Sequence, residues 1–163
     1  MGLERNNLQK GATLVEFAVV LPLLLVLIFG IVEFARIATE FTTVRTAARE
    51  GARFATTIGE DPANPHYVDC AAILAAARDK AVVGNLQEIR VEWDGGYKCS
   101  DPAAADDTGP PAAEDVTTGT AITVTVKSEF DSVVPVLEIF LDGITIDSKQ
   151  TRQIFKGLVE EAP

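Results

Sequence analysis

The stretch ATLVEFAVVLPLLLVLIFGIV, at residues 12–32, decides the fold of this chain. Glu16 is its only charged residue, and no charge follows between Phe17 and Val32. As a helix that rises about 1.5 Å per residue, the segment reaches about 30 Å, which is enough to cross a bilayer. We call residues 12–32 the apolar segment, and its length and composition predict a transmembrane helix.

The charge of the chain is distributed as unevenly as its hydrophobicity. Of the 163 residues 47% are hydrophobic, yet the formal net charge is −10. Residues 1–11 carry a net charge of +1, residues 12–58 carry zero and residues 59–163 carry −11. Arg5 and Lys10 precede the apolar segment and favour a cytoplasmic N-terminus with an exported head. The acidic head argues against nucleic acid as a partner, because phosphate contacts need a basic face.

A secretory signal peptide is the alternative to a membrane anchor, since it also begins with positive charge and an apolar run. The apolar run here is long, no convincing A-x-A site follows it, and it continues into more helix, so the anchor is favoured. Pro22 lies inside the run and predicts a kink, which membrane helices tolerate. Glu16 either has a function there or reaches the lipid headgroups from the interface.

The helix is expected to continue as a stem over residues 33–58. Apolar or small residues recur in it with heptad spacing: Phe34, Ile37, Phe41, Val44, Ala48, Gly51, Ala55 and Ile58. This seam packs either on the head of the same chain or, in part, on neighbouring subunits. Glu40 is assigned to the polar back of the helix, with Arg36 at helix-supporting spacing before it. Three arginines share one face and are expected to meet acidic groups of the head: Arg45, Arg49 and Arg53.

Residues 59–163 form the predicted head, which begins with a turn-rich linker, EDPANPHY, at residues 60–67. A second helix is expected over residues 69–83, with Asp69 as its N-cap and Gly84 at its stop.

Three later segments alternate apolar and polar residues and predict strands: residues 86–93, 120–130 and 144–155. A turn at Asp94 starts a small hairpin that ends near Cys99, and residues 132–141 form a short helix or a covering loop. The predicted fold class is α+β, with a long N-terminal helix, a second short helix and a small antiparallel sheet.

The residues for catalysis or metal binding are scarce. His66 is the only histidine and is expected on a surface loop, and no nucleophile–base set or phosphate loop is visible. Residues 100–119 are rich in Pro, Ala, Gly and Asp and predict a mobile loop. Its acids suggest calcium but lack a regular ligand spacing. We therefore expect no enzyme activity, no cofactor and no metal.

The octapeptide KGATLVEF, at residues 10–17, resembles the leader-peptide junction of type IV pilin-like proteins. In those proteins prepilin peptidase cuts after a glycine, and a glutamate is the fifth mature residue. The resemblance implies that residues 1–11 are a cleaved leader, that Gly11–Ala12 is the scissile bond and that Glu16 is the fifth residue of the mature chain.

The longer pattern GATLVEFAVVLPLLLVLIFGIVEFARI, followed by RTAAREGARFA at residues 45–55, is similar to the TadE family of pseudopilins. Those proteins are minor components of the tight-adherence (Tad/Flp) type IV pilus system. The resemblance implies a pilin-like fold and a minor pilin that helps to initiate or tip the pilus. Glu16 would then pair with the Ala12 amine of a neighbour or, one helical turn away, of its own chain.

The implied partners are prepilin peptidase, other minor pilins, the major Flp pilin, the inner-membrane assembly platform and the lipid bilayer. The implied location is the inner membrane, which the chain crosses once with its head exported. A location at the cell surface, within a pilus that serves adhesion, is also implied. The competing hypothesis is an unprocessed single-pass anchor whose acidic head binds a partner.

Cys70 and Cys99 both fall in the exported head. Two cysteines in an oxidising compartment most often pair, so a disulfide is favoured over two free buried thiols.

Overall fold

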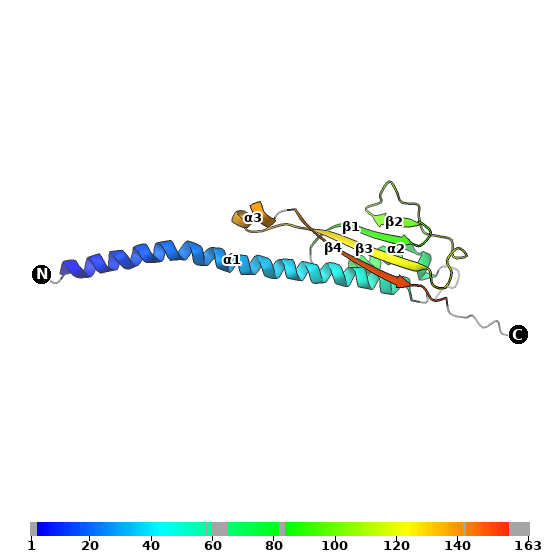
Figure 1. Ribbon diagram of the computed structural model, residues 1–163, viewed down its shortest axis with the longest axis horizontal. Helices are drawn as coiled ribbons and strands as arrows, with labels where there is room; N and C mark the ends of the chain where they lie inside the picture. Colours follow the sequence, from blue (N-terminus) through cyan, green and yellow to red (C-terminus); the bar gives the residue numbers. More distant parts are fainter. Residues whose placement is uncertain (1–2, 58, 60–64, 82–83, 142, 157–163) are drawn as a thin grey trace.

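The computed structural model describes residues 3–57, 59, 65–81, 84–141 and 143–156. Its dominant element is α1, Leu3–Ala55, a helix of 53 residues that runs through Pro22 without a break. The head packs on the C-terminal half of α1, while the N-terminal half projects away from it (Figure 1).

The stem helix ends at Ala55, short of the expected end at Ile58, which lies outside the described residues. Two threonines explain the early end. The hydroxyls of Thr56 and Thr57 bond to the carbonyls of Ala52 and Phe54, and their backbone N–H groups turn to acceptors three residues back. Threonine side chains that bond to nearby carbonyls compete with regular helix in this way.

The head is a four-stranded antiparallel sheet in the order β2-β1-β3-β4. Its strands are β1 Asn85–Trp93, β2 Lys98–Asp101, β3 Ala121–Phe130 and β4 Ile144–Gln153. The expected hairpin is therefore present as β1–β2, and β4 ends two residues before the expected Phe155. The predicted α+β class is confirmed.

One face of the sheet is covered by α1 together with α2, Cys70–Asp79. Strand β3 shows the alternation clearly, because every second side chain, from Ile122 to Phe130, is buried in this layer. Gly51 allows α1 to approach closely: a Cβ there would lie 3.0 Å from the Cβ of Ala77 and 3.2 Å from Cγ1 of Val124. The core thus lies between the stem and the sheet.

Local signals around α2 match its structure. The Asp69 side chain accepts a hydrogen bond from the N–H of Ala72 at 3.0 Å, as an N-cap does. A disulfide joins Cys70 of α2 to Cys99 of β2. The helix ends at Asp79, earlier than predicted, since residues 80–81 are no longer helical. Residues 82–83, at the predicted end, and residues 60–64 of the linker lie outside the described residues.

His66 does not lie free on a surface loop. It begins a short 3-10 helix, η1, His66–Val68, and is half-buried. Its ring stacks on Phe54 with centroids 4.2 Å apart, and its Nδ1 lies 3.0 Å from the hydroxyl of Thr57. The end of the stem supplies both contacts, so His66 joins the head to the stem.

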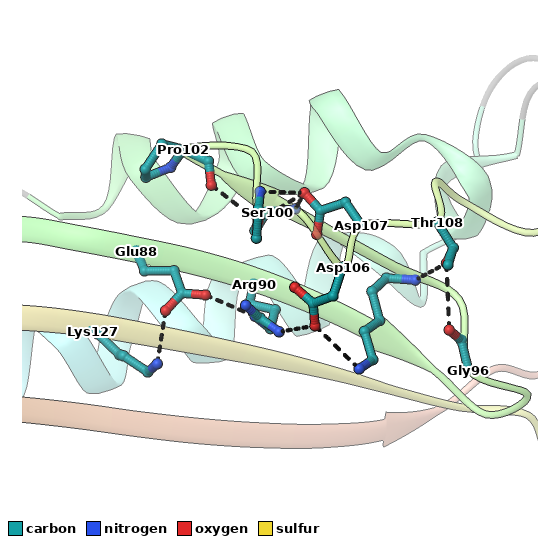
Figure 2. Close-up of polar contacts among 11 residues, drawn as sticks. Glu88, Arg90, Gly96, Ser100, Pro102, Asp106, Asp107, Thr108 and Lys127 are labelled. Carbon is teal, nitrogen blue, oxygen red and sulfur yellow. Dashed lines mark hydrogen bonds and ion pairs between the residues drawn. The ribbon is translucent and has the colours of Figure 1, made fainter.

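The opposite face of the sheet carries a network of charges (Figure 2). The Glu88 carboxylate accepts from Lys127 and from Arg90, both at 2.7 Å, and Arg90 also pairs with Asp106 at 2.9 Å. Val116, which belongs to the same loop as Asp106, is buried. One acid of the loop, Asp106, is thus held by basic side chains of the sheet, and the mobility expected for residues 100–119 stays a prediction.

Candidate functional site

The apolar segment has no cover from the head. All side chains from Thr13 to Phe29 are exposed, with Leu23 at 75% and Val19 at 71%. In the part of the chain that the structure describes, α1 is the one helix long and apolar enough to cross a membrane. Apolar area of this extent in water is costly, so the segment needs a bilayer or other subunits around it.

The residues of the predicted cleavage and assembly site lie at the start of the apolar segment. The backbone of Gly11 and Ala12 is helical and continuous with that of Glu16. Ala12 and Glu16 are four residues apart, so they lie one turn apart on the same face of α1. Glu16 is exposed on an otherwise uncharged surface that extends to Val32.

The heptad seam predicted for the stem is only half correct. Val44, Ala48 and Ala55 are fully buried against the head, but Phe34 is 73% exposed and Phe41 is 50% exposed. A helix of 3.6 residues per turn drifts relative to a 3.5-residue repeat, so a seam that faces the head at one end turns away at the other.

Two glutamates, and not the phenylalanines, lie on the face of α1 that packs against the head. Glu33 is 1% exposed and Glu40 is 5% exposed, and both lie between the stem and the head. Glu40 was expected on the polar back of the helix, and that expectation is wrong. Carboxylates are rarely buried without partners, so their contacts define the polar part of the site.

Glu33 holds the loop before α3, Pro135–Leu141, against the stem. Its Oε1 accepts from the backbone N–H of Val133 at 2.9 Å and of Val134 at 3.1 Å, with the Ser132 hydroxyl 3.2 Å away. Its Oε2 pairs with Nη1 of Arg36 at 2.7 Å. We call this set of contacts the Glu33 clasp.

The electrostatics of the clasp favour the charged carboxylate. Burial alone would raise the pKa of Glu33, but the N–H groups of Val133 and Val134 and the Arg36 guanidinium outweigh it, so its pKa lies below the usual value. Arg36 is fixed in turn by the carbonyl of Asp131 at 3.2 Å and by the ring of Phe130, whose centroid is 5.1 Å away.

Glu40, about two helical turns after Glu33, anchors the sheet to the stem. The Ser128 hydroxyl, which is fully buried, bonds to Oε1 of Glu40 and lies 3.0 Å from the carbonyl of Asn85. Gly84 closes this contact with φ at +109°, and a Cβ there would lie 2.9 Å from the same Oε1. Glu40 therefore fixes the point where β1 and β3 meet the stem.

The sequence contains a signal for this pair that the heptad interpretation missed. Glu33 and Glu40 are seven residues apart and flank Ile37, which is half-buried on the same face. Arg36, which the sequence placed at helix-supporting spacing before Glu40, instead pairs with Glu33 on the preceding turn, while Glu40 binds Ser128.

The three arginines of the stem do not meet the head as expected. Among the described residues, Arg53 pairs with Glu50 of the same helix at 2.6 Å, and Arg45 and Arg49 form no ion pair with the head. All three are exposed, because they lie on the side of α1 that faces away from the sheet.

These features fit one class of protein, a pilin-like membrane protein in which an apolar helix continues as the stem of a sheet-bearing head. A family model described as TadE-like protein matches residues 11–53. No curated protein and no solved structure matches the chain. The resemblance to TadE-like proteins expected from the sequence is thus confirmed over residues 11–53, and it supports an association with Tad pilus systems.

Proposed function

We propose that this chain is a minor pilin that helps to initiate or tip a tight-adherence pilus and performs no chemistry itself. The observation that carries the proposal is the start of the TadE-like match at Gly11. With Gly11 as the last leader residue, Glu16 becomes the fifth residue of the mature chain. This spacing is the one that pilin-like precursors share.

Processing would occur at the Gly11–Ala12 bond, by a prepilin peptidase in the membrane. The bond lies within α1, so the helix must open locally to be cut. Glycine in a helix interior costs about 1 kcal/mol relative to alanine, which makes Gly11 a favourable place for that opening. Cleavage removes Arg5 and Lys10 and leaves a new amine on Ala12, which is cationic near neutral pH.

Assembly would bring Glu16 to the amine of a neighbour. A lone carboxylate in an apolar surface is costly within a bilayer, and pairing with a cation offsets that cost. Phe34 and Phe41 support packing between stems, because they extend the exposed apolar surface of α1 beyond the apolar segment. The head covers the other side of the stem, so neighbours meet this one.

The test separates cutting from assembly. Glu16→Gln removes the charge but keeps the shape, and Glu50→Gln is the matched control on the same helix, outside the apolar segment. We expect both variants to lose residues 1–11, as measured by intact mass. Only Glu50→Gln and the wild-type protein should enter the sheared pilus fraction.

Recovery of Glu16→Gln in that fraction at the wild-type level would refute its role in assembly. The second candidate function is a single-pass anchor whose head, with its net charge of −11, binds a cationic partner. That function predicts that the wild-type protein stays in the inner membrane while pili are sheared off.

A further inference from the structure

The connection between β3 and β4 leaves the sheet and returns to the apolar helix. It contains α3, which lies beside α1 at the membrane end of the head (Figure 1). Between the two is a groove of about 490 Å³. The groove is lined by apolar residues, chiefly Leu25, Val26 and Phe29 of α1 and Val134, Pro135 and Leu137 of the connection.

The outer side of the connection is unusually apolar for a surface in water. Val133 is 71% exposed and Ile139 is 85% exposed, although neither is needed for the core of the head. Val133 lines the groove together with Val26 and Phe29 of the apolar segment, so the two apolar surfaces are continuous there, and Ile139 follows further along the connection, on α3. A bilayer that surrounds α1 at Phe29 therefore reaches the connection as well.

Backbone groups of the connection have hydrogen-bond partners within the protein. Irregular backbone at a membrane needs internal partners, because unsatisfied N–H groups are costly there. Glu33 accepts from the N–H groups of Val133 and Val134, and the carbonyl of Val134 accepts from Leu137 and Glu138.

We propose that residues 132–141 form a second membrane contact, in which Val133 and Ile139 insert among the acyl chains of the outer leaflet beside α1. This inference rests on the proposed function in one respect, namely that α1 spans the bilayer. The Glu33 clasp then fixes the head to the membrane surface at a set height and tilt, instead of leaving it on a single helix.

The depth of the contact follows from the positions along α1. Phe29 precedes Val32, the last residue of the apolar segment, by three residues, or about 4.5 Å along the helix. The α1 residues that line the groove reach back to Pro22, about 15 Å before Val32, so the groove lies in the outer half of the hydrocarbon layer, with the charges of Glu33 and Arg36 above it. Glu138, exposed on α3, limits the insertion to the interface, as for other interfacial helices.

Lipid fits this groove better than a protein partner does. Its lining offers apolar side chains, and acyl chains need no hydrogen bonds from it. The lipid is also already present around α1 in the proposed state, whereas a protein partner would have to displace it.

The experiment places single tryptophans in the full chain and reconstitutes it in vesicles with or without lipids brominated in the acyl chains. Ile139→Trp reports the proposed contact and Leu27→Trp reports the apolar segment. Phe155→Trp is the matched control, because Phe155 is 69% exposed just beyond the other end of β4. Trp93, which is 3% exposed in the head, gives a constant background that the wild-type protein measures.

We expect bromine to quench the added emission of Leu27→Trp and Ile139→Trp but not that of Phe155→Trp. Quenching of Leu27→Trp alone would overturn the second contact and leave the spanning helix intact. Quenching of neither would overturn the spanning helix and, with it, this inference. A blue shift of Ile139→Trp that grows with protein density and resists bromine would show that another subunit fills the groove, which also overturns the proposal.

Discussion

Removal of the Glu33 carboxylate is the perturbation with the largest predicted effect on the junction between stem and head. Glu33→Ala removes the acceptor of the Val133 N–H group, leaves the Val134 N–H group only the Ser132 hydroxyl at 3.3 Å, and removes the ion pair of Arg36. The sheet core is expected to survive, because its buried residues pack between β1, β3 and the C-terminal half of α1. The damage should therefore be local to residues 132–141.

The magnitude comes mainly from the N–H group of Val133, because the N–H group of Val134 keeps the Ser132 hydroxyl as an acceptor. A buried donor that loses its acceptor costs about 1–3 kcal/mol. The ion pair adds little, since the Arg36 side chain is 40% exposed and water can replace the carboxylate. We expect the opening of residues 132–141 to become easier by about 1–3 kcal/mol, or about 5- to 160-fold in its equilibrium constant.

Amide hydrogen exchange of the full chain in micelles measures this opening directly. The amides of Val133 and Val134 should lose protection by that factor, while those of β3 keep theirs. Glu50→Ala is the control, because Glu50 has the same three-residue spacing to its partner Arg53 but, among the described residues, accepts from no backbone N–H group of the head. Its exposed pair should contribute less than about 1 kcal/mol. Equal exchange at Val133 in the two variants would refute the reasoning.

Three further predictions concern acid, the Gly84 turn and the disulfide. The folded-state pKa of Glu33 lies below the unfolded value of about 4.3. The stabilisation by the Glu33 carboxylate is therefore complete above that pH and is lost as the pH falls through the folded-state pKa. The amides of residues 132–141 should accordingly lose hydrogen-exchange protection in acid, measured relative to their intrinsic exchange rates. Gly84→Ala should destabilise the head by about 1–3 kcal/mol in denaturant unfolding, because its Cβ meets Glu40 at a positive φ. Replacement of both Cys70 and Cys99 by alanine should lower the free energy of unfolding by about 3.5 kcal/mol, since the bridge spans 29 residues.

Each of these predictions has a control and a contradicting result. Glu33→Gln should abolish the acid-dependent step in the loop, and an unchanged step would assign it to another group. Gly96→Ala also has a positive φ but meets nothing within 4 Å, so an equal loss of stability there would contradict a role for the Glu40 contact. Unchanged stability after reduction would contradict the disulfide.

Local patterns in the sequence predicted most of the fold. The apolar segment, the Asp69 cap and the alternation from Ile122 to Phe130 each depend on residues close in sequence, so periodicity and capping rules suffice for them. The resemblance to TadE-like proteins could likewise be recognised from the sequence, because its motif is contiguous.

The clasp could not be predicted because its partners lie far apart in the chain. Glu33 bonds to backbone one hundred residues away, and Glu40 bonds to Ser128, which is 88 residues away. Without those partners a glutamate on a helix is rightly assigned to solvent. The exposure of Phe34 and Phe41 has the same cause: the head packs on the face of α1 that carries Glu33 and Glu40, so the two phenylalanines are left uncovered.

The most direct test of the proposed function is the N-terminal sequence of the protein extracted from membranes of cells that contain a prepilin peptidase. Processing at the proposed bond predicts a chain that begins Ala-Thr-Leu-Val-Glu, from Ala12 to Glu16. A chain that still begins at Met1 in those cells would contradict it.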